Sequence, residues 1–209
     1  MFRACPSSSN VTGATSRWRE EVDAEKGDAR VSTERRVGLG YDTHRFDPNR
    51  VLVLGGVTIP GEAGLEGHSD ADLVAHAVMD ALLGAAGLGD IGDRFPDDDP
   101  RYRDADSMEL LREVTRELAQ PGWRVVNVDV TVVAERPRIA PFRREMTDCL
   151  AKALGVGAVD VNVKATTNEG MGFIGRGEGI AALAVAQIER TRDNGHEQPG
   201  ASPARDQGR

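Results

Sequence analysis

Two side chains that commonly bind metal ions stand two residues apart in the run GLGYDTHRF. They are Asp42 and His44, a carboxylate and an imidazole separated by Thr43. Because alternate side chains of a strand point to the same face, these two would lie side by side. Both are good zinc ligands. The pair therefore indicates a metal site, with an ordinary surface pair as the alternative, since so short a spacing also arises by chance.

A third ligand, His76, comes from a different part of the chain, the apolar run LVAHAVMDALL. One alternative is a core histidine with satisfied hydrogen bonds, and another is a solvated helix face formed by Asp72, His76 and Asp80. Together with the pair above, however, His76 completes a set of three ligands. Three protein ligands leave one coordination position open, which is typical of catalytic rather than structural zinc.

The motif HSDAD, residues 68–72, leads into the helix that carries this histidine. Ser69 or Asp70 is the predicted N-cap of that helix. Free N–H groups and the positive end of the helix dipole favour an anion at Ser69, which would place a phosphate near the metal. Simple capping is the alternative, and the two interpretations are compatible.

Acidic side chains are concentrated in a loop that follows this helix. The loop contains Asp90-Ile91-Gly92 and then Phe95-Pro96-Asp97-Asp98-Asp99-Pro100. The bracketing prolines predict a turn, and a solvated turn is the alternative to a functional role. In a functional role, the carboxylates would accept hydrogen bonds from substrate hydroxyls.

A later strand pattern ends in hydroxyl and acidic side chains, in the run KATTNE, and glycine then alternates with charge in GFIGRGEG. Glycine allows the backbone to approach a ligand closely, although tight packing is the alternative. Threonine hydroxyls, Arg176 and a magnesium ion held by Glu169 are what a diphosphate would require.

An α+β fold must position these residues. Strands are expected at 36–43, 124–134, 159–165 and 178–189, a glycine-broken hairpin at 51–59, and helices at 70–86, 106–119 and 138–154. In the clearest strand, Val126, Val128, Val130 and Val132 are expected to share one face. This order predicts a mixed β-sheet with helices packed on one face, including ferredoxin-like βαβ elements.

One domain is expected over residues 36–190, and the polar segments 1–35 and 191–209 predict disordered tails. For the first segment the alternative is a targeting peptide, for example to a plastid, because Arg3, Arg17 and Arg19 precede the first acidic residue, Glu20. The apolar region of a secretory signal is missing.

Composition argues against several classes of protein. Two cysteines build neither a disulfide framework nor a cysteine zinc site, and they favour a reducing, cytoplasmic location. A net charge of −8 without a lysine or arginine block argues against a nucleic-acid partner. No apolar run approaches the ~18 residues that a membrane span needs.

Taken together, the motifs HSDAD, GDIG, FPDDDP, DVNVKATTNE and GRGEG resemble those of the 2-C-methyl-D-erythritol 2,4-cyclodiphosphate synthase family. The resemblance covers about residues 36–190, the whole of the expected domain. It implies a homotrimer with active sites between adjacent subunits. It also implies one divalent cation, zinc, bound by Asp42, His44 and His76, and magnesium or manganese bound with the substrate diphosphate through Glu169.

The resemblance implies His68, Thr167 and Glu169 as catalytic residues. It places His68 and Ser69 by the phosphates, and Asp90 and Gly92 by the ribose or the erythritol. The loop from Phe95 to Asp99 would face the methylerythritol, and the cytidine pocket would be formed by Ala134, Pro137, Arg138 and Ile139. The implied substrate contacts are Asp42, His44, His68, Ser69, Asp90, Ile91, Gly92, Phe95, Pro96, Asp97, Asp98, Asp99, Ala134, Pro137, Arg138, Ile139, Ala140, Thr166, Thr167, Asn168, Glu169, Phe173 and Arg176.

The implied reaction converts 4-diphosphocytidyl-2-C-methyl-D-erythritol 2-phosphate to a cyclic diphosphate with release of CMP. Ligand spacing alone does not distinguish an internal phosphate from water as the nucleophile, so a metal-dependent phosphohydrolase is a second hypothesis. A third is a trimeric binding protein with structural zinc, against which the open coordination position and the scarcity of cysteine argue.

Overall fold

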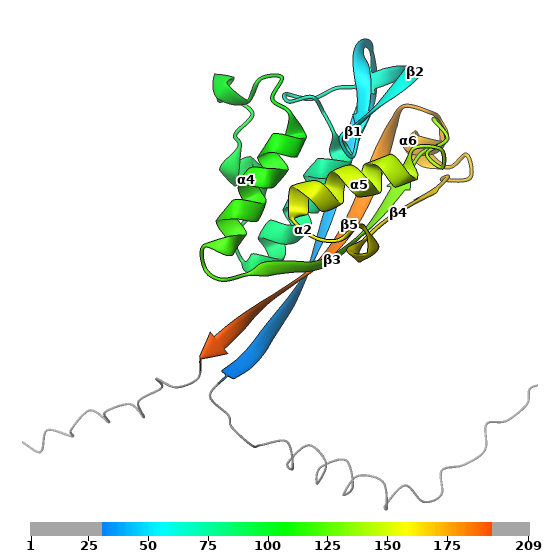
Figure 1. The fold of residues 1–209 in the computed structure, drawn as a ribbon. Coiled ribbons are helices and arrows are strands. Elements are labelled where there is room, and N and C mark those ends of the chain that lie inside the picture. Colours follow the sequence, from blue (N-terminus) through cyan, green and yellow to red (C-terminus); the bar gives the residue numbers. More distant parts are fainter. Residues whose placement is uncertain (1–30, 194–209) are drawn as a thin grey trace, which may run out of the picture. The chain divides into compact units, whose positions relative to one another are not determined.

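The computed structural model describes residues 31–193, and residues 33–190 form one compact unit (Figure 1). Strand β1 begins at Val31 and strand β5 ends at Asp193, so both strands extend beyond the expected domain boundaries. The rest of the expected tails, and the targeting-peptide alternative, lie outside the described residues. None of the described helices is long and apolar enough to cross a lipid bilayer.

The sheet is mixed, as the sequence predicts, and its strand order is β2-β1-β5-β3-β4. It has five strands rather than the six expected, because the strand expected at 36–43 and the first strand of the hairpin are one continuous strand, β1. Strands β3 and β4 are parallel, whereas β1 pairs antiparallel with β2 and β3 pairs antiparallel with β5. The expected hairpin is the β1–β2 turn at Gly55-Gly56, where φ angles of 58° and 76° favour glycine. The strands are β1 (Val31–Leu54), β2 (Val57–Leu65), β3 (Arg124–Val133), β4 (Val161–Thr166) and β5 (Gly179–Asp193).

Three long helices cover one face of this sheet, as expected, and within residues 31–193 no helix covers the other face (Figure 1). In β5, Ala182, Ala184 and Ala186 are fully buried, whereas Leu183 and Val185 between them are 37% and 41% exposed. The long helices are α2 (Leu73–Ala86), α4 (Ser107–Ala119) and α5 (Arg143–Leu154), and the short ones are α3 (Ile91–Arg94), α6 (Gly172–Gly175), η1 (Pro100–Tyr102) and η2 (Ala158–Asp160).

A β-bulge changes the expected face of β3 at its start. Val125 pairs with Ile188 and Asn127 with Gln187, so Val126 is the extra residue. The prediction that Val126 shares the buried face of the later valines is therefore wrong, and Val125, 7% exposed, takes that place. A bulge shifts the alternation by one residue, which the valine pattern does not reveal.

Two helices begin later than the sequence predicts. The N-cap of α2 is Asp72, not Ser69 or Asp70, and its buried carboxylate accepts hydrogen bonds from the N–H groups of Val74 and Ala75. The same carboxylate accepts from the two glycine N–H groups of the β1–β2 turn, at 2.8 and 2.6 Å. Helix α5 starts at Arg143 rather than at residue 138, since Pro141 disfavours helical backbone in the residue before it.

Candidate metal centre and active site

Asp42, His44 and His76 converge on one point although they come from two elements. Asp42 Oδ2 lies 2.8 Å from His44 Nε2 and 3.0 Å from His76 Nδ1, and the two ring nitrogens are 3.3 Å apart. The first two side chains extend from the same face of β1, and His76 extends from the first turns of α2. The three ligand atoms therefore stand close enough to share one ion, as the spacing of β1 and the apolar helix predicted.

The orientation of the His44 ring is set by a backbone group. Its Nδ1 lies within hydrogen-bonding distance of the Glu66 carbonyl oxygen. A carbonyl can only accept, so Nδ1 carries a proton, and in the neutral ring Nε2 has the lone pair, which faces Asp42 and His76. A ligating histidine commonly has this kind of support at its other nitrogen.

The far nitrogen of His76 is also occupied. Nε2 lies 3.1 Å from the hydroxyl of Ser69 and 3.0 Å from that of Ser107, and both serines are buried. His76 is only 8% exposed. His76 is thus a histidine with satisfied hydrogen bonds at Nε2, and its Nδ1 points toward Asp42 and His44. The alternative of a solvated face formed by Asp72, His76 and Asp80 is wrong, because Asp72 is fully buried as the helix cap.

Electrostatics favour an ionised Asp42. Burial tends to raise the pKa of Asp42, but the His44 and His76 rings, which donate hydrogen bonds to its carboxylate and carry positive charge when protonated, hold it well below its ordinary value. Burial tends to lower the pKa of His44, and the hydrogen bond and charge of Asp42 outweigh this and raise it. One carboxylate beside two imidazoles is a donor set that suits zinc. The residues present therefore fit a bound divalent cation.

The ligand group opens into a cavity of about 240 Å³. Other residues that the sequence predicts for substrate binding line the same cavity, and they come from the HSDAD motif and from the loop after α2. Its lining includes Asp42, His44, His76, His68, Ser69, Ile91, Gly92, Phe95 and Asp97, together with Met79, Tyr102 and Leu110. A small ligand in this cavity would meet the metal group on one side and the 91–97 loop on the other.

Loop residues 90–99 are held by contacts within the loop and to α2. Asp80 accepts a hydrogen bond from the Ile91 N–H at 2.9 Å, which fixes the loop to the helix that carries His76. Asp90 caps α3. Asp99 accepts from the backbone and side chain of Arg101, which lowers the pKa of its carboxyl. Asp90, Pro96, Asp98 and Asp99 are not among the residues that line the cavity.

The N–H groups at the start of α2 are not all free to bind an anion. Two of its free N–H groups already donate to the Asp72 carboxylate. The N-cap prediction is therefore wrong, because the Asp72 carboxyl group holds that position, whereas a phosphate near Ser69 stays a prediction. Ser69 remains available through its side chain, which lines the cavity.

A second group of predicted site residues follows the carboxyl ends of the parallel strands β3 and β4. The Ala134 N–H donates to the Thr166 carbonyl at 3.0 Å, so the two strand ends lie side by side. Glu135 accepts from the N–H groups of Asn168 and Gly170, and Thr167 donates to Glu169 at 2.8 Å. This second group comprises Ala134, Pro137, Arg138, Ile139, Ala140, Thr166, Thr167, Asn168, Glu169, Phe173 and Arg176.

The two groups occupy the same end of the sheet but different strands. Thr43, between the two ligands of β1, donates to the Ile180 carbonyl at the start of β5, and Ala181 of β5 pairs with Val133 at the end of β3. Strands β1 and β4 are separated by β5 and β3, or about 14 Å at ~4.8 Å per strand spacing. The residues of the second group do not line the cavity of the metal ligands.

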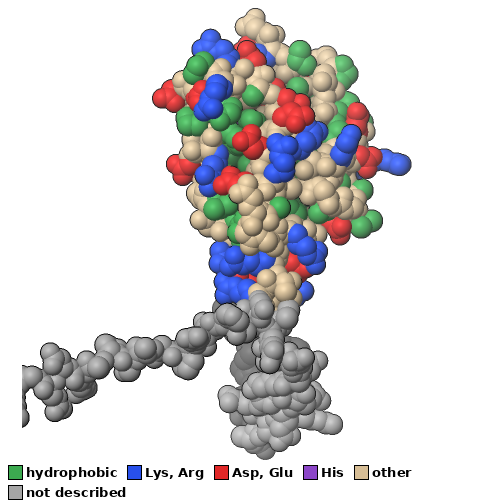
Figure 2. Space-filling model, turned by 60° about the vertical axis from the view of Figure 1, so that its left-hand side comes forward, with side chains coloured by type: hydrophobic (Ala, Val, Ile, Leu, Met, Phe, Trp, Pro, Cys, Tyr) green, Lys and Arg blue, Asp and Glu red, His purple; other side chains and the backbone are tan. Residues whose placement is uncertain are grey.

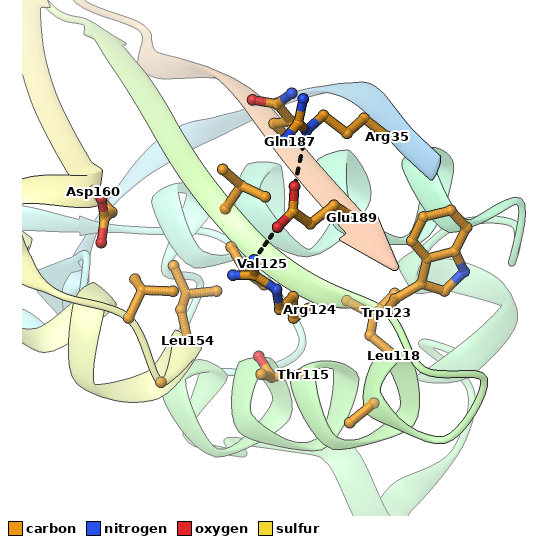
Figure 3. Close-up of a pocket in the computed structure, with 14 residues that line it drawn as sticks. Arg35, Thr115, Leu118, Trp123, Arg124, Val125, Leu154, Asp160, Gln187 and Glu189 are labelled. Carbon is orange, nitrogen blue, oxygen red and sulfur yellow. Dashed lines mark hydrogen bonds and ion pairs between the residues drawn. The ribbon is translucent and has the colours of Figure 1, made fainter. Parts of the chain in front are cut away.

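The opposite end of the sheet holds a larger hollow, about 750 Å³, around Glu189 (Figure 3). Glu189 of β5 is paired with Arg35 of β1 and Arg124 of β3, and Arg36 and Arg190 are paired with Glu34. Figure 2 shows basic side chains, with acidic ones among them, gathered at the lower end of the domain. These charges are paired with each other and link neighbouring strands. None of the predicted site residues line this hollow.

Sequence reasoning missed several residues that shape the site. Ser107 contacts His76, Glu66 supplies the carbonyl to His44, and Arg50 donates to the carbonyl groups of Gly67 and Ser69. Ser107 follows the N-cap Asp106, so its only sequence signal was that of a helix start. Backbone carbonyls have no sequence signal at all.

Fold and site together define an α+β domain with a candidate metal site, in which three side chains that could bind one ion open into a cavity. The chain belongs to the YgbB family, whose model matches residues 35–189. A relative from Desulfatibacillum aliphaticivorans, named 2-C-methyl-D-erythritol 2,4-cyclodiphosphate synthase, is 60% identical over 154 residues, which are 74% of this chain and 99% of that protein.

Solved structures agree with this assignment. The bifunctional IspDF from Campylobacter jejuni is 43% identical with a TM-score of 0.74, over 76% of this chain and 43% of that longer chain. IspF from Plasmodium falciparum, in a complex with CDP, is 31% identical with a TM-score of 0.65, over 75% of this chain and 96% of the other. The resemblance that the sequence motifs suggested is thus confirmed.

Proposed function

We propose that this chain converts 4-diphosphocytidyl-2-C-methyl-D-erythritol 2-phosphate to 2-C-methyl-D-erythritol 2,4-cyclodiphosphate and CMP. It would be a phosphorus–oxygen lyase of non-mevalonate isoprenoid precursor biosynthesis. The observation that carries the proposal is the convergence of Asp42, His44 and His76 in a chain 60% identical to a relative with that name.

The three convergent ligands would hold one divalent cation, zinc by the chemistry of the donor set. When bound, this ion supplies Lewis acidity and positive charge to a phosphate oxygen. A net charge of −8 makes such local compensation necessary for a polyanionic substrate. Glu169 would hold a second cation, magnesium or manganese, with the diphosphate, because these ions prefer oxygen ligands.

The reaction forms one P–O bond and breaks another within a single substrate. An oxygen of the 2-phosphate attacks the β-phosphorus, and the bond from that phosphorus to the oxygen bridging it to the α-phosphorus breaks. The bridging oxygen leaves with CMP. The nucleophile is already an anion, so the chain's main task is to fold the substrate into position, which can contribute roughly 7–11 kcal/mol.

The cavity residues would orient the phosphates and the erythritol. His68 and Ser69 would donate to phosphate oxygens, and the 90–99 loop would accept from hydroxyls. His68, Thr167 and Glu169 would be catalytic. His68 and Thr167 would donate hydrogen bonds to phosphate oxygens, and Glu169 would act through the cation that it holds. The cytidine would contact Ala134, Pro137, Arg138 and Ile139. The diphosphate would contact Thr166 and Thr167, and Ala140, Asn168, Phe173 and Arg176 would be further substrate contacts.

A homotrimer would bring the two groups of site residues together. Within one protomer they lie on strands separated by two others. The open face of the sheet supports association, because Val37, Leu39 and Tyr41 of β1 are 65%, 66% and 52% exposed there. Such an apolar surface marks an interaction site. The metal group of one subunit would then face the nucleotide group of the next.

Light scattering after size-exclusion chromatography tests this assembly. We expect three times the protomer mass of 22.4 kDa. Leu39→Asp should lower the mass and the turnover together, because it places a charge in the contact. Val159→Asp is the matched control, since Val159 is 96% exposed outside that sheet face. A monomer with full activity would contradict the trimer.

Phosphorus NMR of the reaction tests the activity itself. We expect one cyclic diphosphate and CMP in equal amounts. Release of inorganic phosphate would favour the phosphohydrolase hypothesis. Stoichiometric binding of zinc and CDP without turnover would favour the binding protein. A cytoplasmic location is part of the proposal and rests on the two cysteines of the composition.

A further inference from the structure

Ser107 is the first residue of α4, and the proposed reaction gives it no role. Its side chain is fully buried, and its hydroxyl meets three polar groups. The Oγ atom lies 3.0 Å from His76 Nε2, 3.2 Å from the Ser69 hydroxyl and 2.5 Å from Asp70 Oδ1. This buried hydroxyl has a single proton, which it can donate to only one of these three groups.

The carboxylate of Asp70 determines that direction. An ionised carboxylate can only accept, so the contact between Asp70 and Ser107 requires Ser107 to donate its proton. A hydroxyl that donates to an ionised carboxylate makes a charge-assisted hydrogen bond, which is stronger than one between neutral groups. With its proton used, Ser107 can only accept from His76, so Nε2 must carry the hydrogen. His76 Nδ1 then keeps a lone pair toward Asp42 and His44.

This arrangement opposes a competing one. Asp42 lies 3.0 Å from His76 Nδ1 and would, as an acceptor, draw the ring proton to that nitrogen. A proton on Nδ1 would remove the lone pair that a metal ion needs. Two carboxylates therefore compete for the proton of neutral His76, Asp42 directly and Asp70 through Ser107.

Ser69 also lies near His76 Nε2, but its hydroxyl proton is not directed to a carboxylate. Its hydroxyl accepts from the Ala71 N–H at 3.2 Å and lies 3.1 Å from His76 Nε2. Its proton can turn to Ser107 or to His76, so it fits either tautomer. Asp70, by contrast, is anchored on both sides, because its N–H donates to Ala105 and its Oδ2 accepts from the Ser107 N–H.

We propose that Ser107 is a positioning residue of the metal centre, which links the Asp70 carboxylate to His76 and keeps the His76 Nδ1 lone pair directed at the cation. The inference rests on the proposed function, since it assumes that Asp42, His44 and His76 bind a metal. It adds two residues, Asp70 and Ser107, that touch neither the metal nor the substrate and act only through His76.

The test uses the full-length protein and zinc or cobalt alone, without substrate. Ser107→Ala should weaken metal affinity by about 10- to 100-fold, measured by competition with a chromophoric chelator. Ser69→Ala is the matched control, and its loss should be clearly smaller. Nitrogen-15 NMR of the metal-free protein should show the Nε2–H tautomer of His76 reduced in Ser107→Ala and retained in Ser69→Ala.

Asp70→Asn provides a second route if Ser107→Ala fails to fold. The amide can donate to Ser107, which frees the serine proton to turn toward His76 and permits the wrong tautomer. We expect weaker metal binding and a mixed tautomer in this variant also. Unchanged affinity and tautomer in the folded Ser107 or Asp70 variant, or an equal loss in Ser69→Ala, would overturn the inference. If the wild-type protein binds no divalent cation, or if His76→Ala binds the cation as tightly as wild type, the proposed function itself fails.

Discussion

Gly40 of β1 lies directly against the carbonyl oxygen of Ala77 in α2. A Cβ atom built on Gly40 would stand only 1.9 Å from that oxygen, and one built on Gly38 would stand 1.9 Å from the carbonyl of Ala81. The strand and the helix therefore meet at backbone contact, which only glycine permits. Ala77 is the neighbour of His76, so this contact sets the distance at which His76 approaches Asp42.

Gly40→Ala should consequently damage both stability and metal binding. The added methyl group must push α2 away from β1, and overpacking of this kind costs about 3 kcal/mol. Urea denaturation would measure the loss, and a cobalt titration would detect the displaced His76. Gly84→Ala is the control on the same helix, because a Cβ there meets nothing within 4 Å. It should stabilise by about 0.5–1 kcal/mol. Wild-type cobalt affinity in Gly40→Ala would show that this contact does not position the ligand.

His76→Ala should abolish binding of the divalent cation while the fold survives. Alanine is a good helix former, so α2 should persist. Zinc should raise the melting temperature of wild type by binding only the folded state, and should have no effect on the variant. His68→Ala provides the contrast, since His68 lines the cavity without belonging to the ligand group. It should keep the zinc-induced shift and lose turnover. A normal zinc shift in His76→Ala would refute the ligand assignment.

Glu169→Gln should lower turnover and raise the magnesium concentration needed for half-maximal rate. The amide is a weaker ligand for a hard cation than the carboxylate. Steady-state rates over a magnesium titration measure both effects, at constant zinc. Glu109→Gln is a suitable control, because Glu109 is an exposed acid of α4. If the two variants had the same magnesium dependence, Glu169 would not hold the second cation.

Glu189→Gln should destabilise the end of the sheet opposite the active site. The hydrogen bond from Arg35 lowers the pKa of Glu189 against the opposing effect of burial, and Arg124 lowers it further. A carboxyl whose pKa is lower in the folded state stabilises the protein above its ordinary value of 4.5, and this contribution disappears as pH falls through the lowered pKa. The difference in unfolding free energy between wild type and variant should therefore be large at pH 7 and shrink in acid. Urea titrations at both pH values measure it, and a difference independent of pH would argue against the ion pairs as its source.

Local pattern alone determined much of this protein. The alternation along β1 placed Asp42 and His44 on one face, the turn glycines gave the hairpin, and the apolar period of α2 placed His76 on its inner side. Such features depend on neighbouring residues, whose relative directions are fixed by the strand and helix repeats. The motifs were also sufficient to indicate the family, which the comparisons confirm.

Only the tertiary structure decided how these pieces meet. The approach of α2 to β1 depends on Gly38 and Gly40. Asp72 is the N-cap of α2 because its carboxylate also accepts a hydrogen bond from the Gly55 N–H in the β1–β2 turn. The bulge at Val126 and the contact of Ser107 with His76 arise from strand register and helix placement. These are contacts between residues distant in sequence, and they depend on packing of the whole domain, which no local periodicity encodes.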